Sequence, residues 1–433
     1  MKSGKSDTNL GSKISRVGQI DRDGNRLFVH GDLSPGNLYI LLAALHQAVE
    51  KAGFDELTLD LSNCSTAFPG PMLAVCAQVA RLRESGVYAS LVLPKDEKLR
   101  TLFHNANWAH LLDPKTQDQS KFKGHTRVPA TPFRSPEEQQ AAVNRIIGAI
   151  LGAIPDIERS DFAAFEWAIN ELTDNVLTHS QSTIGGLVQV STFKKNEKRV
   201  EFVVADAGIG IPESLRSSYP ELSTDTEALD KAIREGVTRD KSLGQGNGLF
   251  GSWQICSHCK GHFQVDSGYA RLIHRPKDKP KGGLHVYNER VPFAGTLIVA
   301  AIDFTNPKLL QEALRFGGQL HTPIDYIETH FEDGTTTDLH FKVRNEAASL
   351  GSRPAGTPLR TKLKNLAKMA PGRKIIVDFE DIGLVSSSFA DEVFGKLFLE
   401  MGPLAFMQTF EFRRISSMVH QIIDRAIQQR SRT

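Results

Sequence analysis

The motif ELTDNVLTHS occupies residues 171–180 and is followed by DAGIGI at 206–211 and by GQGNGL at 244–249. Each motif is weak evidence by itself. In this order they combine a helix carrying an acid and an amide, a strand ending in Asp and Gly, and a glycine-rich turn opening a helix. The sequence therefore predicts a nucleotide-binding site between about Ser160 and Ile255.

The first motif falls in a predicted helix over 160–179, where apolar residues recur at three- and four-residue intervals. Glu171 and Asn175 are four residues apart and so share one face of this helix. Mg²⁺ prefers hard oxygen ligands, so the Asn175 carbonyl oxygen with nucleotide phosphates is a reasonable site. Glu171 is suited to orient or deprotonate a water or a substrate hydroxyl. The alternative is a solvated helix face, and for His179 we expect a structural role.

The second motif ends an apolar strand at Asp206. A carboxylate at the end of a buried strand needs a polar partner, and the amino group of an adenine base is one. Gly208 and Gly210 allow the backbone to approach the base and to turn without a clash at Cβ. The alternative interpretation is a plain turn.

The third motif places Gly244, Gly246 and Gly248 just before an apolar helix. Exposed amides at a glycine-rich helix start are suited to binding phosphates. The spacing is not that of a dinucleotide-binding fingerprint, because no strand directly precedes the glycines and no βαβ unit surrounds them.

With these motifs, residues 137–305 resemble a GHKL ATPase domain, the Bergerat fold shared by histidine kinases, anti-sigma-factor serine kinases, type II topoisomerases, mismatch-repair ATPases and Hsp-type chaperones. AGTLIVAAI at 294–302 is similar to the closing strand of that family. The resemblance implies ATP and Mg²⁺ as ligands. No phosphoacceptor-histidine helix is recognisable upstream, which argues against an autophosphorylating histidine kinase.

The resemblance also implies roles for individual residues. Glu171 would be the general base, Asn175 the Mg²⁺ ligand, Asp206 the adenine contact and Thr296 a water-mediated adenine contact. The glycines that would shape the base pocket and the lid are Gly208, Gly210, Gly244, Gly246 and Gly248.

The segment 16–114 has the predicted order β-β-α-β-α-β-α and resembles a STAS domain, the fold of anti-sigma-factor antagonists. In that family an Asp-Ser-Ser-Gly turn after the central strand carries a regulatory phosphoserine. The corresponding turn here is Phe68-Pro69-Gly70-Pro71, so the acceptor serine is missing.

The segment 323–433 contains VDFEDIGLVSSSFADEVFGKL at 377–397, which resembles the STAS-like domains of unknown function fused to ATPases. Its serine turn, Ser386-Ser387-Ser388, is present. We expect a hairpin over 326–343 followed by helices and one buried strand. The two end domains are then divergent copies of one fold.

The remaining segments have weaker patterns. Residues 1–15 are expected to be a flexible tail, and 115–136 and 306–322 to be linkers, with a helix-like stretch over 309–318. Residues 211–243 are predicted to be an irregular lid. The basic stretch 268–292 is interpreted as a solvated hairpin, with an anionic contact surface as the alternative. The predicted fold class is α/β, with an α+β sandwich as the ATPase domain and two smaller STAS-like α/β domains.

Composition excludes several classes of protein. The chain has 433 residues, 40% of them hydrophobic, and a net charge of +2, which gives no clear nucleic-acid signal. The longest apolar run near the N-terminus, 38–49, is too short to span a bilayer, so no membrane partner is expected. Four cysteines are too few for a disulfide framework and fit a reducing cytoplasm. Cys256-Ser-His-Cys259 lacks a second cysteine pair, which favours buried thiols over zinc.

Three hypotheses on function follow. The first is an ATP-binding regulatory protein, a signalling switch or serine-kinase-like ATPase, with Ser386, Ser387 or Ser388 as a candidate intramolecular acceptor. The second is a dimerising ATPase clamp that phosphorylates no protein. The third is a non-enzymatic nucleotide-binding adaptor. A protein partner or a homodimer would form through the STAS-like domains.

Overall fold

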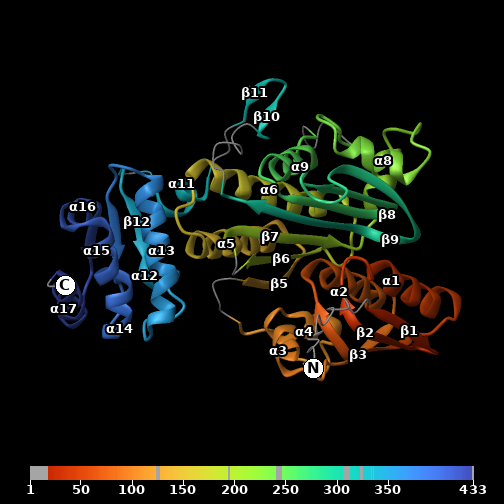
Figure 1. Cartoon of the computed structure of the whole chain (residues 1–433), viewed down its shortest axis with the longest axis horizontal. Coiled ribbons are helices and arrows are strands. Elements are labelled where there is room, and N and C mark those ends of the chain that lie inside the picture. Colours follow the sequence, from red (N-terminus) through yellow and green to blue (C-terminus); the bar gives the residue numbers. More distant parts are fainter. Residues whose placement is uncertain are drawn as a thin grey trace, which may run out of the picture.

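The structure is a computed structural model of the chain. It describes residues 18–122, 127–193, 196–239, 246–305, 313–321, 325–332, 334 and 336–431, so the predicted tail 1–15 lies outside the described residues. The fold is of the mixed α/β type that the sequence predicts, with three α/β units in succession (Figure 1).

The centre of the molecule is a five-stranded antiparallel sheet with the order β5-β6-β7-β9-β8. Its strands are β5 (Arg127–Phe133), β6 (Gly186–Phe193), β7 (Asn196–Asp206), β8 (His262–Arg275) and β9 (Gly283–Asp303). Helices α5 (Pro136–Ala153), α6 (Arg159–His179) and α9 (Gly248–His258) cover one face (Figure 1). Because side chains alternate along a strand, Phe202 packs on the α6 side and Val203 on the other.

The N-terminal unit covers that second face. Its sheet has the order β1-β2-β3-β4, antiparallel between β1 and β2 and parallel elsewhere. Its elements are β1 (Gln19–Asp23), β2 (Arg26–Leu33), α1 (Leu38–His46) with a π-helical turn (Gln47–Lys51), β3 (Glu56–Ala67), α2 (Pro69–Glu84), β4 (Tyr88–Val92), α3 (Glu97–Asn105) and α4 (Trp108–Leu112). Helices α1 and α2 share a buried core with Val203, Leu297 and Val299 of the central sheet. The Gln78 side chain donates to the Ala294 carbonyl at 2.7 Å, which fixes α2 on β9.

The C-terminal unit contains a three-stranded parallel sheet, β12-β13-β14. Its elements are α11 (Tyr326–Phe331), β12 (Leu339–Lys342), α12 (Val343–Glu346), α13 (Arg353–Met369), β13 (Ile375–Asp378), α14 (Ser387–Ala390) continuing through a π-helical turn (Asp391–Gly395) into α15 (Lys396–Met401), α16 (Pro403–Thr409), β14 (Phe410–Arg413) and α17 (Ser417–Ser431). The buried Asn365 of α13 donates to the carbonyl oxygens of Leu151 and Ile154, both at 2.8 Å. This unit therefore docks on the end of α5.

Two stretches predicted to lack regular structure contain regular elements. Strand β5 lies inside the predicted linker 115–136, and its prolines are tolerated because β5 is an edge strand. The predicted irregular lid 211–243 contains α7 (Gly210–Arg216) and α8 (Asp225–Ala232). A capping box of Thr224 and Glu227 begins α8, a signal that the sequence does contain.

Two predicted elements of the C-terminal third are wrong. The first half of the predicted hairpin 326–343 is helix α11, because Asp325 caps it by accepting from the Glu328 amide at 3.1 Å. Of the predicted helix 309–318, residues 309–312 lie outside the described residues. Gly317 and Gly318 adopt positive φ and reverse the chain between β10 (Arg315–Phe316) and β11 (Gln319–Leu320).

The basic stretch 268–292 forms a hairpin, as predicted, by extending β8 and β9 beyond the sheet. None of the described helices combines the length and the apolar composition that crossing a bilayer requires.

Candidate functional site

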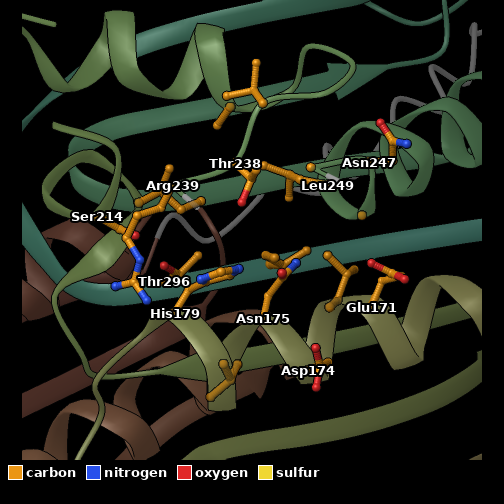
Figure 2. A pocket seen from close by; sticks show the side chains of 18 of the residues that line it. Glu171, Asp174, Asn175, His179, Ser214, Thr238, Arg239, Asn247, Leu249 and Thr296 are labelled. Atoms are coloured by element: carbon orange, nitrogen blue, oxygen red, sulfur yellow. The ribbon is translucent and has the colours of Figure 1, made fainter. Parts of the chain in front are cut away.

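A cavity of about 380 Å³ lies between α6, the start of α9 and the central sheet, a size within the usual range of small-molecule sites. Trp167, Glu171, Asn175 and His179 line it at four-residue intervals along α6. Figure 2 shows that Glu171, Asn175 and His179 project from the same side of the helix. The opposite side of α6 is apolar and buried in the core, so its packing fixes where the lining side chains point.

The start of α9 lies directly against two of these side chains. A Cβ atom on Gly248 would lie 2.6 Å from Oε2 of Glu171, so a larger residue would displace that carboxylate, and 3.4 Å from Nδ2 of Asn175. Burial raises the pKa of Glu171, and the nearby Asp174 raises it further. A carboxylate with a raised pKa is a better base near neutral pH. The Asn175 amide supplies a hard oxygen of the kind that Mg²⁺ binds.

Asp206 ends β7 at the other end of the cavity and is 3% exposed. Burial raises the pKa of Asp206 to about 7, although the Gly208 and Thr296 amides oppose the shift. The Gly208 amide donates to Asp206 Oδ1 at 2.8 Å. A Cβ atom on Gly208 would overlap the carbonyl oxygen of Ser180, so glycine is required for the loop to pass the end of α6.

Ser267 of β8 contacts the lining residues Ile211 and Thr296 from behind, and no motif indicated it. Its buried hydroxyl donates to the Gly295 carbonyl at 2.7 Å and accepts from the Ile211 amide at 2.9 Å. It also lies 3.3 Å from Thr296 Oγ1. Gly210 has φ +78°, and a Cβ atom there would lie 2.7 Å from Ser267 Oγ. This end of the cavity therefore has little room to adjust.

The segment after α8 closes the cavity from above. Arg239 donates to the Thr178 carbonyl at 3.1 Å and lies near His179 and Thr296 in Figure 2. The Gly236 amide donates to the Asn247 side chain at 3.0 Å, which joins this segment to the start of α9. Arg239 therefore places a positive charge at the Asp206 end.

The structure brings most of the predicted residues together. The cavity is lined by Glu171, Asn175, Asp206, Gly210, Gly246, Gly248 and Thr296. Gly208 lies behind Asp206, and Gly244 lies outside the described residues. The lining residues that sequence reasoning missed include Trp167, Thr238, Arg239, Asn247, Phe316 and His321. Trp167 had a signal, since it precedes Glu171 by one helical step, and Asn247 stands inside the third motif. The others stand in no motif.

Residues 161–295 match the family model described as histidine kinase-, DNA gyrase B- and HSP90-like ATPase. They form a GHKL ATPase domain. Residues 355–420 of the same chain match the model described as a STAS-like domain of unknown function (DUF4325). Neither match includes 16–114, so a STAS-like N-terminal domain stays a prediction. Searches among curated proteins and among solved structures found no match.

The GHKL match implies ATP binding, and the cavity fits that ligand. Asp206 offers an acceptor at one end, and the glycine-bounded start of α9 faces Glu171 and Asn175 at the other. Within the described ranges, no group of three or more His, Cys, Asp or Glu side chains is arranged to hold a metal ion. A Mg²⁺ ion here would thus rely on Asn175 and the nucleotide phosphates. An ATPase domain joined to a STAS-like domain supports an ATP-binding regulatory function.

Proposed function

We propose that this chain is a Mg-ATP-dependent signalling switch, in which nucleotide turnover at the GHKL domain controls the STAS-like domain. The observation that carries the proposal is the placement of Glu171, Asn175 and Asp206 around one cavity. The STAS-like match over 355–420 supports the proposal from another part of the chain.

Each of these residues has a distinct proposed task. The Asp206 carboxylate accepts a hydrogen bond from the adenine amino group. The Asn175 amide oxygen holds Mg²⁺, which when bound neutralises charge on the β- and γ-phosphates. Glu171 takes the proton from the attacking water or hydroxyl as the bond between the γ-phosphorus and the bridging oxygen breaks and ADP leaves.

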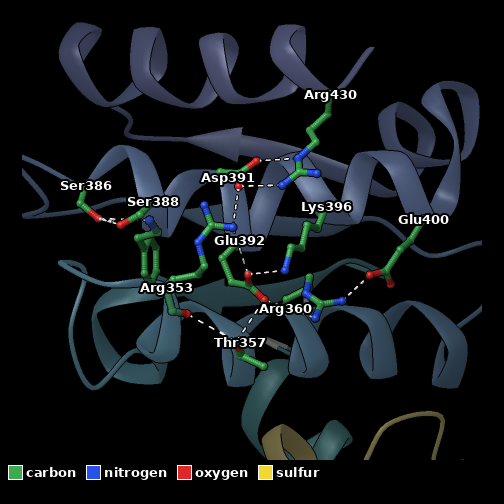
Figure 3. Close-up of polar contacts among 11 residues, drawn as sticks. Arg353, Thr357, Arg360, Ser386, Ser388, Asp391, Glu392, Lys396, Glu400 and Arg430 are labelled. Carbon is green, nitrogen blue, oxygen red and sulfur yellow. Dashed lines mark hydrogen bonds and ion pairs between the residues drawn. The ribbon is translucent and has the colours of Figure 1, made fainter. Parts of the chain in front are cut away.

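The serine turn of the C-terminal unit has one exposed serine and two half-buried ones. Ser386 Oγ accepts from the Phe389 amide at 3.1 Å and lies 3.1 Å from Ser388 Oγ (Figure 3). Ser387 is exposed. One helical turn later, the buried Glu392 pairs with Lys396 at 2.5 Å and with Arg360 at 3.3 Å. The pair with Arg360 ties the helix that follows the turn to α13.

The place of the serine turn in the fold bears on which nucleotide site could phosphorylate it. Helix α14 lies in the C-terminal unit at one end of the molecule, whereas α9 lies over the central sheet and α8 lies toward the other end (Figure 1). Helices α8 and α9 contribute lining residues to the cavity. Transfer from a cavity to the serine turn of the same chain has no support in this arrangement. We propose that the acceptor belongs to a second copy of the chain or to a protein partner. The same separation favours the second candidate function, an ATPase clamp that phosphorylates no protein.

Incubation with ATP labelled at the γ-phosphate, followed by mapping, distinguishes these versions. A chain carrying Asn175→Ala is mixed with a chain in which Ser386, Ser387 and Ser388 are all alanine. Label on the Asn175→Ala chain supports transfer between chains. Phosphate release without protein label supports the clamp, binding without turnover supports a non-enzymatic adaptor, and the absence of nucleotide binding contradicts the proposal.

A further inference from the structure

One wall of the cavity comes from outside the matched ATPase domain. The hairpin β10–β11 follows the domain in the chain, and its Phe316, together with His321 just after β11, lines the cavity beside Trp167. The chain before the hairpin is anchored, because Ala313 and Leu314 are buried in the main core. The His321 amide donates to the Leu314 carbonyl at 2.8 Å and so closes the hairpin.

Aromatic contacts hold the hairpin against the ATPase domain. The Phe316 ring lies 5.7 Å from that of Trp167 and 6.3 Å from that of Phe250. Gly251 of α9 makes room for this packing, since a Cβ atom there would overlap the Trp167 ring. The Gly317 amide donates to Glu235, just after α8. The hairpin thus joins α6, α9 and the segment over the cavity.

The position of His321 follows from the order of residues along α6. An α-helix rises about 1.5 Å per residue, so Trp167 lies one step of about 6 Å beyond Glu171, on the side away from Asn175. The His321 ring lies 6.0 Å from that of Trp167. The other basic lining residues of the described chain, His179 and Arg239, stand at the opposite end, near the end of α6.

This distribution of charge matters for a nucleotide. A base held at Asp206 directs the phosphates toward Glu171 and Gly248, so the terminal phosphate comes nearest to Trp167 and His321. Glu171 and Asp174 make that end acidic. A hydrogen bond to a charged phosphate oxygen is one of the stronger hydrogen bonds in proteins. Among the described lining residues, His321 is the basic side chain placed to donate it at that end.

We propose that His321 contacts the terminal phosphate of ATP and that β10–β11 makes the site distinguish the triphosphate from the diphosphate. The inference rests on the proposed function, since it needs ATP in this cavity. ADP, which lacks that phosphate, makes no bond with His321.

The C-terminal unit begins a few residues after the hairpin and contacts α6 there. Four residues after His321, Asp325 pairs with Arg159 of α6 at 2.6 Å and caps α11. The next amide, that of Tyr326, donates to the buried Glu166 at 2.7 Å. The described contacts of the C-terminal unit with α6 thus begin four residues after His321.

The test is the ratio of ATP to ADP affinity, measured by calorimetry with Mg²⁺ in wild type, His321→Gln and His321→Lys. His321→Gln should weaken ATP about tenfold, as expected for loss of a charged hydrogen bond, and leave ADP within about twofold. His321→Lys should restore the preference. His420→Gln, an exposed histidine on α17, is the matched control and should change neither affinity.

Three results would contradict the inference about His321. An unchanged ratio in His321→Gln, or an equal loss of ATP and ADP, overturns the role of His321 while leaving the proposed function intact. Failure of the wild type to bind either nucleotide overturns both.

Discussion

The two ends of the cavity are built in different ways. At the Asp206 end, neighbouring backbone segments fit so closely that Gly208 and Gly210 have no room for side chains, and buried Ser267 bonds to both walls. At the Glu171 end, the wall consists of separate pieces: the start of α9, Trp167 and the hairpin β10–β11. A tight end suits selection of one base. A composite end suits a response to the phosphates, because a ligand shifts only those parts whose contacts it changes.

The largest effect is expected at the composite end. Glu171→Ala removes the proposed base, so phosphate release at saturating ATP should fall by about a hundredfold or more. ATP affinity should stay within about threefold, since Glu171 acts on the reaction rather than on binding. Phosphate release and calorimetry check the two parts. Asp424→Ala, an exposed acid on α17, is the control. Hydrolysis at the wild-type rate in Glu171→Ala would contradict the assignment.

A substitution at the Asp206 end should change the affinity for all adenine nucleotides by the same factor. Asp206→Ala removes the acceptor for the base, and about 10- to 100-fold of affinity should be lost, the usual value of a hydrogen bond to a charged group. The loss should be the same for ATP, ADP and adenosine, in contrast to His321→Gln. A selective loss of ATP alone would show that Asp206 does not face the base.

Close packing of the tight end can be tested through stability. Gly208→Ala forces a Cβ atom into the Ser180 carbonyl and should cost about 1–3 kcal/mol of unfolding free energy, the range for overpacking. Gly383→Ala is the matched control, since nothing lies within 4 Å of its Cβ position and its φ is not positive. Thermal unfolding of both variants decides the question, and equal melting temperatures would mean that the Gly208 loop is free to move.

The smallest expected effect is on pH dependence. The pKa of Asp206 is raised to about 7, and only the ionised carboxylate accepts fully from the adenine amino group. ATP affinity should therefore fall as pH drops below about 7, by at most about tenfold per pH unit, and level off above it. Asp206→Asn removes this titration, so the ratio of wild-type to variant affinity isolates it from phosphate and Glu171 ionisation. A ratio independent of pH would contradict the assignment.

The sequence predicted the tight end better than the composite end, for a physical reason. Asp206, Gly208 and Gly210 stand in one motif at a strand end, so local chemistry alone indicates their task. Phe316 and His321 reach the cavity only because the chain reverses at Gly317 and Gly318 and packs on Trp167. No local pattern contains that information.

The fold, too, contains elements that local sequence patterns predicted and elements that they did not. Alternating helices and strands predicted three α/β units, yet β5 was missed because its prolines suit only an edge strand, and edge position is a tertiary property. The helix α11 was taken for a strand, although Asp325 is a good N-cap. The docking of α1 and α2 on the central sheet has no signal in either segment alone.

The most direct test of the central claim is a comparison of Mg-ATP and Mg-GTP binding to the wild-type chain by equilibrium dialysis. A carboxylate at the base end accepts from the adenine amino group but meets the carbonyl oxygen of guanine at that position. We predict one ATP per chain and an affinity for GTP weaker by about tenfold or more. Equal binding of the two nucleotides, or no binding of ATP, would contradict the account.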